Sequence, residues 1–244
     1  MTSGILLPPA SSASTAGALA DVVETARRLD AGTAPFLVVT AAAVGGLSPL
    51  HVAAHLGART SRIGIVVEHR ADGVEPSHMS SALATLDHTT RGRAGWLIPD
   101  AGRDAEAMAD AAAVVDAVAL LWDSWEDDAV IRDRATGRYL DRAKLHAVDA
   151  TGPDFTIAGP SITPRPPQGR PVVLLAAEAA ALASEGRSAR WVDIVLDGAD
   201  SRGVSIAGPD TAGCLGGEGV SGTTLREVLG LDRPASVFSG RTNA

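Results

Sequence analysis

The chain is short of several residue types, and each shortage excludes a class of protein. Its 244 residues contain one cysteine, Cys214, so an intramolecular disulfide is impossible and a cysteine-based zinc site is not expected. A reducing, cytoplasmic setting fits this cysteine usage. No apolar run reaches the roughly 18 residues of a membrane-spanning helix, so we expect no membrane partner. The first residues lack a basic region and resemble no signal peptide.

The chain has almost no lysine, and its acidic residues outnumber its basic residues. Lys144 is the single lysine among 21 basic residues, while 29 acidic residues give a formal net charge of −8. Because nucleic-acid binding depends on clustered cations that neutralise phosphates, this balance argues against a nucleic-acid partner. With 45% hydrophobic and 20% charged residues, the composition is that of a soluble globular protein with a sizeable core. We expect one α/β domain over residues 1–244.

Short apolar runs alternate with alanine-rich helical segments along most of the chain. This alternation is typical of βαβ units, in which helices join parallel strands. Helices are expected between the strands, the first capped by Ser14 and ended by Gly32. Strands are expected near residues 4–7, 35–43, 62–67, 94–98, 172–177 and 191–198, with a further candidate at 203–208.

The chain is too short for a complete eight-stranded barrel once two irregular stretches are set aside. A full (β/α)₈ barrel takes about 250 residues. Here a polar, proline-rich insertion at 126–171 follows the fourth helix, and a tail rich in glycine, serine and proline occupies 209–244. We therefore expect an incomplete barrel of six or seven parallel strands. Because an open strand edge invites association, a homodimer or hetero-oligomer is expected.

Other constellations in the sequence have ordinary interpretations. The run GEGVSGTT at 217–224 has the outline of a phosphate loop but lacks its lysine, and neither a G-x-S-x-G nor a GxGxxG motif occurs. Several acidic and imidazole side chains flank the third strand and helix, but their spacing fits no metal signature, so no metal is expected. For His78, Asp87 and His88 we expect helix packing and capping, and for the four tryptophans a place in the core.

Three blocks of the sequence resemble one known family. The first, from Thr60 to Trp96, contains RIG, EP, ATLDH and GRAGW; the second contains WDSWEDDA, TGRYLD, GPDFTIAGP and PQGRPVV; the third is GTTLRE-x-LGL-x-RP from Gly222 to Pro234. They stand in the order found in the nitrilotriacetate monooxygenase component A-like branch of the bacterial-luciferase-like flavin monooxygenases. The chain thus resembles a shortened and divergent member of that family.

The resemblance implies a luciferase-like TIM barrel and a function. Members of the family bind reduced FMN that a separate flavin reductase supplies, and they oxidise a small organic substrate with oxygen. From the resemblance we expect FMN as cofactor, and a small-molecule substrate or ligand and a flavin reductase as partners.

The chain departs from the family pattern where the flavin lies. After AGW the family has polar residues, whereas here Leu97, Ile98 and Pro99 lead to Asp100. An acidic loop with His and Tyr that precedes the fourth helix in the family has no counterpart. After the fifth strand, a glycine- and serine-containing turn that receives the flavin phosphate is replaced by Ala177-Glu178-Ala179. A carboxylate about 4 Å from a phosphate costs roughly 1–4 kcal/mol, so this grip is expected to be weak.

The candidate site residues follow from the geometry of parallel barrels, whose active sites lie at the carboxyl ends of the strands. No catalytic residue can be assigned. The side chains expected to bind the cofactor or line the pocket are Glu68, His69, Arg70, Trp96, Asp100, Ala177 and Glu178.

Two hypotheses remain open at the level of sequence. The first is an FMN-dependent monooxygenase with Glu68, His69 and Asp100 around its pocket. The second is a non-catalytic relative, a ligand-binding or partner subunit that kept the scaffold and lost the phosphate turn. The altered turn favours the second.

Overall fold

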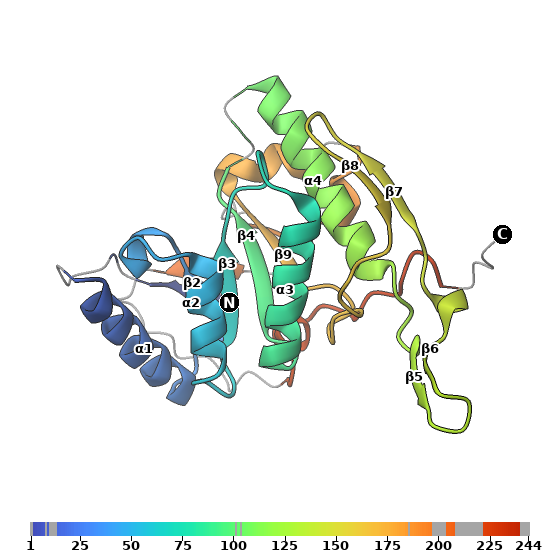
Figure 1. The fold of residues 1–244 in the computed structure, drawn as a ribbon. Helices are drawn as coiled ribbons and strands as arrows, with labels where there is room; N and C mark the ends of the chain where they lie inside the picture. The colour runs from blue at the N-terminus through green and yellow to red at the C-terminus, as the bar shows by residue number, and fades with distance from the viewer. Residues whose placement is uncertain are drawn as a thin grey trace.

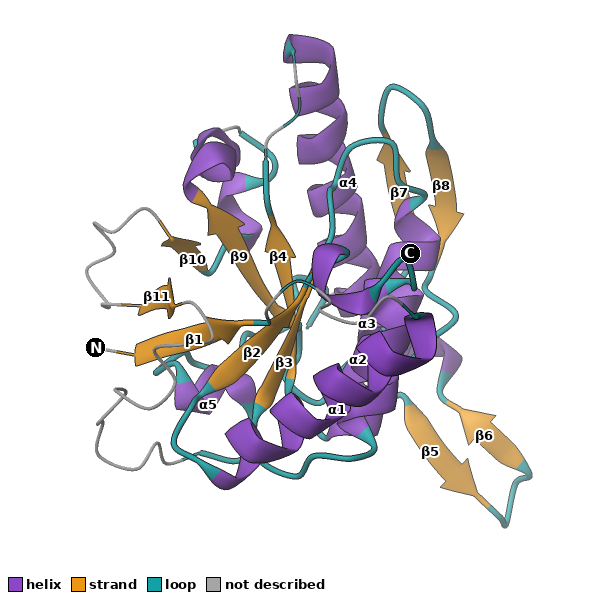
Figure 2. Ribbon diagram, turned by 90° about the vertical axis from the view of Figure 1, so that its left-hand side faces the viewer, coloured by secondary structure: helices purple, strands orange, loops and turns teal. Residues whose placement is uncertain are grey.

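A curled, parallel sheet forms the centre of the protein. The computed structural model describes residues 2–7, 9, 14–100, 102, 104–184, 186–196, 204–207 and 222–239. The sheet order is β10-β9-β4-β3-β2-β1-β11, and every neighbouring pair is parallel (Figure 2). Its strands are β1 (Thr2–Leu6), β2 (Phe36–Val39), β3 (Gly64–Glu68), β4 (Ala94–Ile98), β9 (Val172–Ala176), β10 (Ile194–Leu196) and β11 (Val204–Ala207).

The two edge strands, β10 and β11, approach each other, so the sheet bends towards a closed barrel (Figure 2). This confirms the expected luciferase-like barrel with six or seven strands. Helices cover the outer surface of the sheet (Figure 1). They are α1 (Thr15–Ala31), η1 (Ala42–Val44), α2 (Pro49–Gly57), α3 (Pro76–Thr90), α4 (Ala105–Asp123), η3 (Ala177–Ala183) and η4 (Ala189–Trp191).

Helix boundaries follow local capping chemistry. Ser14 accepts a hydrogen bond from the amide of Gly17 at 3.1 Å, and α1 ends at its C-cap Gly32, both as predicted. Glu75 caps α3 by accepting from two backbone amides, and Pro76 follows at the first helical position, where its missing N–H costs nothing. Asp104 caps α4 in the same way.

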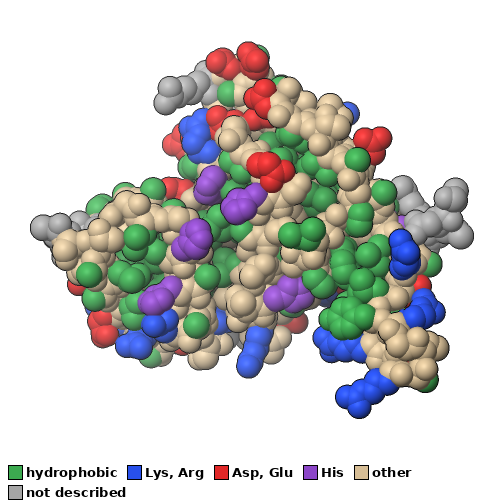
Figure 3. Space-filling model, in the orientation of Figure 1, with side chains coloured by type: hydrophobic (Ala, Val, Ile, Leu, Met, Phe, Trp, Pro, Cys, Tyr) green, Lys and Arg blue, Asp and Glu red, His purple; other side chains and the backbone are tan. Residues whose placement is uncertain are grey.

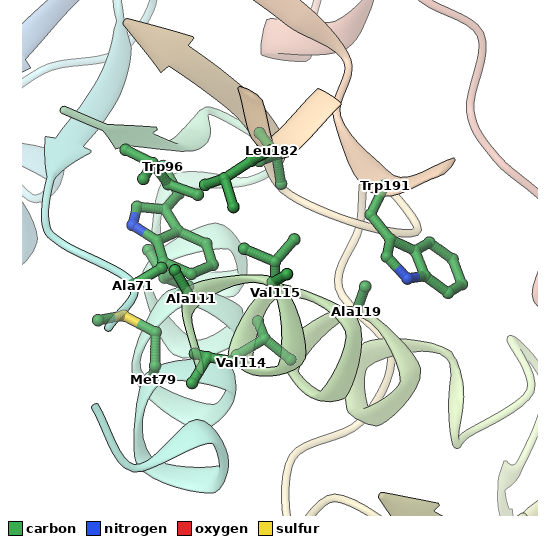
Figure 4. Packing of buried hydrophobic residues seen from close by; sticks show 14 of the residues in the cluster. Ala71, Met79, Trp96, Ala111, Val114, Val115, Ala119, Leu182 and Trp191 are labelled. Atoms are coloured by element: carbon green, nitrogen blue, oxygen red, sulfur yellow. The ribbon is translucent and has the colours of Figure 1, made fainter. Parts of the chain in front are cut away.

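Alternate side chains of each strand point to opposite sides of the sheet. Phe36, Val38 and Val66 face the barrel interior, while Leu37 and Ile65 face the helices. The outer face of β4 meets α3 and α4 around Trp96 (Figure 4). The tryptophans at 96, 122, 125 and 191 are all buried, which confirms their predicted place in the core.

The insertion between α4 and β9 consists of two antiparallel hairpins joined by a short helix. They are β5 (Val130–Asp133) with β6 (Arg138–Leu140), η2 (Arg142–Lys144), and β7 (Val148–Thr151) with β8 (Thr156–Gly159). The β7–β8 hairpin lies along α4, where Val148 and Ile157 pack against Ala117 and Leu121 (Figure 1). The β5–β6 hairpin instead projects away from the body (Figures 1 and 2).

The described part of the tail closes the barrel at the amino ends of the strands. Helix α5 (Leu225–Val228) begins with a capping box made by Thr224 and Glu227. Leu225 is 1% exposed and enters the barrel interior, in the space left by two glycines. A Cβ on Gly64 would lie 2.6 Å from Leu225 Cδ1, and one on Gly95 would lie 3.1 Å from its Cδ2.

Arg226, the next residue, is buried and fixes this segment to the sheet. Its guanidinium donates to both carboxylate oxygens of Asp193, at 2.8 and 2.9 Å, and to the carbonyl oxygen of Arg170. Its amide donates to Gln168 Oε1 at 2.9 Å. Residues 209–221 and 240–244 of the expected tail, with Cys214 and most of the 217–224 run, lie outside the described residues.

A buried ion cluster ties the insertion to the last residues of the tail. The Asp123 carboxylate is fully buried, and it accepts from Arg165 at 3.0 Å, from Arg170 at 2.6 Å and from the amide of Val237 at 3.1 Å. Burying an unpaired charge raises the free energy of the folded protein. Loss of either arginine would therefore destabilise the buried Asp123 carboxylate. At the edge of this cluster, Asp127 pairs with Arg165 and Arg233.

The barrel plug predicts a specific loss of stability. Replacing Leu225 with alanine leaves a cavity between Gly64 and Gly95, and we expect it to lower the free energy of unfolding by about 2–5 kcal/mol. Urea denaturation of the purified protein measures this. The matched control is Val237→Ala, at a position 36% exposed, which should change the free energy of unfolding by less than about 1 kcal/mol. Equal effects would show that Leu225 does not fill the barrel end.

The Asp127 pair predicts a pH dependence. Hydrogen bonds from Arg233, then from Arg165, lower the pKa of the Asp127 carboxyl to about 2. Since the folded-state pKa lies below the unfolded value of about 3.9, its stabilisation is present above pH 4 and is lost as the pH falls towards 2. In Asp127→Asn the free energy of unfolding should therefore fall less between pH 4 and pH 2 than in the wild type. In the control Asp149→Asn, at an exposed position of β7, it should fall as much as in the wild type. Identical acid-denaturation curves for the wild type and Asp127→Asn would contradict the lowered pKa of Asp127.

Candidate functional site

The carboxyl ends of all seven strands meet at one end of the barrel, opposite the plug formed by α5. Inward-facing positions there carry Leu6 of β1, Glu68 of β3, Leu97 of β4, Ala176 of β9 and Leu196 of β10. These side chains are apolar except for Glu68. The mouth of the barrel is therefore an apolar ring with one carboxylate.

Glu68 is the last residue of β3 and pairs in register with Leu97. It is half-buried, and this desolvation raises the pKa of its carboxyl above the usual value. Among the described residues, no donor forms a hydrogen bond with it. Such a carboxylate can accept a hydrogen bond or a proton from a molecule in the mouth.

The next residues of the loop after β3 turn away from this mouth. The His69 ring lies 2.8 Å from the carbonyl oxygen of Arg70 through Nδ1, and the His69 carbonyl accepts from Trp96 Nε1 at 2.8 Å. Trp96 is fully buried on the outer face of the sheet, against Ala71, Met79 and Ala111 (Figure 4). The expectation that Trp96 lines the pocket is therefore wrong, because strand alternation points its ring towards the helices.

Arg70 joins the loops that follow β3 and β4. It donates to Asp72 at 2.7 and 2.9 Å and to Asp100 at 2.7 Å. The hydrogen bond to Asp72 is the main reason why the pKa of the Arg70 guanidinium is raised. Three of the predicted site residues, Glu68, Arg70 and Asp100, thus lie at the same end of the barrel. Arg70 is occupied by carboxylates of the protein itself.

The turn after β9 is where the sequence predicted a weakened phosphate grip. It forms the 3-10 helix η3, and no side chain caps its first residue. Ala177 and Glu178 are exposed in the first turn, and Ala179 is buried in the core. The first turn thus presents the carboxylate of Glu178 and the methyl group of Ala177, with no hydroxyl or amide side chain.

Two polar side chains farther along the same segment already have partners. Ser188 Oγ donates to the carbonyl of Leu182 at 2.7 Å, and Arg190 pairs with Asp116 at 3.0 Å. Since a phosphate needs several free donors at a helix start, the residues of this turn do not fit the phosphate group of FMN.

The acidic and imidazole residues around α3 do not form a metal centre. Asp87 is fully buried and accepts from the side chain of Gln168 at 2.6 Å and from the amide of Ala94 at 3.1 Å. Burial raises the pKa of its carboxyl in spite of these bonds. Within the described residues, no group of three or more histidine, cysteine or acidic side chains could hold a metal ion. Nor does any described helix have the length and apolar character to cross a membrane.

A second surface was not predicted from the sequence, although the sequence contains its signal. Helices α2 and α3 contain no Lys, Arg, Glu or Asp other than the buried Asp87. We name their exposed surface the α2–α3 face; in Figure 3 histidines gather on it among apolar and neutral side chains. Its exposed residues are His51, Ala54, His78, Thr85, His88 and Thr89.

A groove borders this face on the side of the insertion. It has a volume of about 350 Å³ and lies between α3 and β8, with His78, Ser81 and Ile157 among its lining residues. Ile162, which also lines the groove, is 86% exposed. The exposed carboxylate of Glu75, at the start of α3, also lines this groove, and the other lining residues are uncharged or histidine.

Comparison with known families agrees with the fold. Residues 1–210 match the model of the luciferase-like monooxygenase family. The protein belongs to the luciferase-like monooxygenases, which confirms the resemblance read from the sequence.

Individual relatives divide into two kinds by length. One of the subunits of pristinamycin IIA synthase from Streptomyces pristinaespiralis is 32% identical, and the alignment covers 97% of this chain and 98% of the relative. Nitrilotriacetate monooxygenase component A of Aminobacter aminovorans is 38% identical over 53% of this chain but only 32% of its own length. A solved riboflavin lyase with modified FMN superposes with a TM-score of 0.61 at 24% identity, covering 80% of this chain and 54% of the other. The chain therefore spans the whole of one relative and about a third to a half of the others.

Proposed function

We propose that this chain is a non-catalytic subunit of a luciferase-like flavin monooxygenase assembly, docked against a longer chain of the same family. The observation that carries the proposal is the turn after β9, where Glu178 and two alanines stand at the start of η3. The chain retains the barrel, and this turn offers nothing that would hold an anionic cofactor.

The charge around the barrel mouth supports the same interpretation. In the sequence, residues 68–75 and 99–106 contain six carboxylates and two arginines, a net charge of −4. We name the described residues among them the acidic rim. Arg70, one of the two arginines, is already paired with Asp72 and Asp100. Each carboxylate near a bound phosphate adds a repulsion of roughly 1–4 kcal/mol at about 4 Å. An FMN phosphate at this end of the barrel is therefore disfavoured.

The lengths of the relatives also support a subunit role. The relative that matches over its entire length is named as part of a multi-subunit synthase, whereas the matching monooxygenase component is about three times longer than the matched part. The match to a synthase subunit along nearly its whole length supports the proposal that this chain is one member of an assembly.

The α2–α3 face is the proposed docking surface for that longer chain. Surface helices of monomeric proteins are rich in charged residues, and the cores of protein interfaces are depleted of them. Two adjacent helices without an exposed carboxylate, lysine or arginine fit an interface core. The groove beside Ile162 extends this surface onto the insertion.

A second candidate function is a complete FMN-dependent monooxygenase, with its reductase and a small organic substrate. The observation in its favour is Glu68, a half-buried carboxylate with a raised pKa inside the apolar mouth. In this case Glu68 would hold or accept a proton at Oε1 or Oε2, and Leu97 and Leu196 would exclude water. The phosphate would then have to bind away from the turn after β9.

Flavin binding distinguishes these functions. We expect the wild-type melting temperature to be unchanged by 1 mM FMN, because a ligand that does not bind the native state cannot stabilise it. Replacing Glu178 with glycine removes the repulsive charge and frees the backbone, so FMN affinity should rise at least about tenfold. Isothermal titration calorimetry with FMN measures the affinity.

The variant Glu178→Gln separates charge from backbone freedom and should give an intermediate gain, whereas Glu106→Gln on the acidic rim should give a smaller one. A wild-type melting temperature raised by several degrees with FMN would reject the non-catalytic proposal. It would favour the second candidate.

The docking surface gives a separate test. The double variant Ala54→Glu and Thr85→Glu places two charges on the α2–α3 face and should weaken binding to the longer chain about tenfold or more. The probes are the full-length luciferase-like monooxygenases encoded in the same genome, each purified and measured by biolayer interferometry. The control pair Ala16→Glu and Ala20→Glu adds the same charge on α1 and should leave binding unchanged. If none of these chains binds the wild type, the subunit proposal fails.

A further inference from the structure

The hairpin formed by β5 and β6 is exposed on the surface of the protein. We name residues 130–140 the arm. It is a separate two-stranded sheet that projects from the body and does not hydrogen-bond with the central sheet (Figures 1 and 2). An isolated two-stranded hairpin is marginally stable in water, so a projecting one gains most from a surface that covers it.

The side chains of the arm are those of a contact surface. Ile131 is 37% exposed and Tyr139 is 59% exposed, two of the four exposed large hydrophobic residues in the described part of the chain. Arg132 lies over the ring of Tyr139 at 6.0 Å. Tyrosine and arginine are enriched where binding energy concentrates in interfaces, and here they are placed side by side.

The arm is also basic in an acidic protein. Residues 130–140 contain three arginines and one aspartate, a net charge of +2, whereas the whole chain has a net charge of −8. Asp133 is bound within its own turn, to the amide of Ala135 and the hydroxyl of Thr136. Arg132 and Arg134 have no carboxylate partner among the described residues. Their charges are therefore available to another molecule.

The matching negative surface is the acidic rim of the same protein. Residues 68–75 and 99–106 have a net charge of −4 in the sequence, and Glu106 on the rim is exposed without a basic partner in the described residues. Arm and rim lie at opposite ends of the face seen in Figure 3, the arm's basic side chains at the lower right and the acidic ones at the top. One chain cannot bring its own arm and rim together.

We infer that the arm docks on the acidic rim of a second copy of this chain. In an antiparallel two-fold pair, the arm of each copy meets the rim of the other. The symmetry therefore repeats the same arm–rim contact twice in one dimer. The contact is made by residues of the arm and the rim, and the turn after β9 takes no part in it. Self-association of this chain tests the inference, whereas binding to the longer chain tests the function proposed above.

Sedimentation equilibrium of the full chain, at 20 to 500 mM sodium chloride, tests the inference. The expected result is a dimer whose Kd rises with salt, because exposed charge pairs are screened. Arg132→Glu with Arg134→Glu should raise the Kd at least about tenfold at low salt. The control, Arg27→Glu with Arg28→Glu on exposed positions of α1, changes the net charge equally and should alter the Kd less than about threefold.

Two further variants define the contact itself. Tyr139→Ala should weaken the dimer without changing its salt dependence, since it removes an apolar contact. Glu106→Lys by itself should weaken the dimer. A mixture of Glu106→Lys with the variant Arg132→Glu and Arg134→Glu should dimerise more tightly than either variant alone. Circular dichroism verifies that each variant is folded.

Several results would overturn the inference. They are a wild-type chain that stays monomeric at high concentration and low salt, a control pair that weakens the dimer as much as the arm pair, and a mixture that gains nothing. Binding of duplex DNA that the arm variant abolishes, with self-association unchanged, would assign the arm to nucleic acid instead.

Discussion

The contact between Leu225 and the amino end of the sheet is the constraint on which the structure depends. A parallel barrel needs its interior filled, and here a residue from the tail fills it beside Gly64, the first residue of β3, and Gly95, the second residue of β4. Arg226 then fixes the same helix to Asp193, beside β10. The tail signature read in the sequence is therefore part of the barrel, since without it the inner layer of side chains would be open to water.

The second organising feature is the distribution of charge. Buried ion pairs around Asp123 hold the insertion and the tail together, while the acidic rim contains most of the carboxylates near the barrel mouth and the arm contains three arginines. Charges at the mouth oppose an anionic cofactor, and a lack of charge on α2 and α3 favours contact with another protein. Both properties agree with the non-catalytic subunit that we propose.

Much of the fold could be predicted from the sequence because its signals are local. The strand AGWLI begins and ends where the apolar run does, and Ser14 and Gly32 bound α1 through capping chemistry that involves neighbouring residues. The positions of the candidate site residues could be predicted only in part. Glu68 and Asp100 follow strand ends and so lie at the mouth, but Trp96 was misplaced because the sequence alone did not specify which side of the strand faces the helices.

By itself, the sequence determined the parallel βαβ order and the incomplete barrel, which follow from residue types and spacing along the chain. The family, and with it the altered turn after the fifth strand, came from the resemblance of three motif blocks to known members. The tertiary structure alone decided that Leu225 fills the barrel, that Arg70 is occupied by Asp72 and Asp100, and that the arm projects as a basic hairpin. These features depend on contacts between residues far apart in the chain, or on which segments remain exposed after the chain has folded. Only the folded arrangement brings such residues within hydrogen-bonding distance or exposes such a surface.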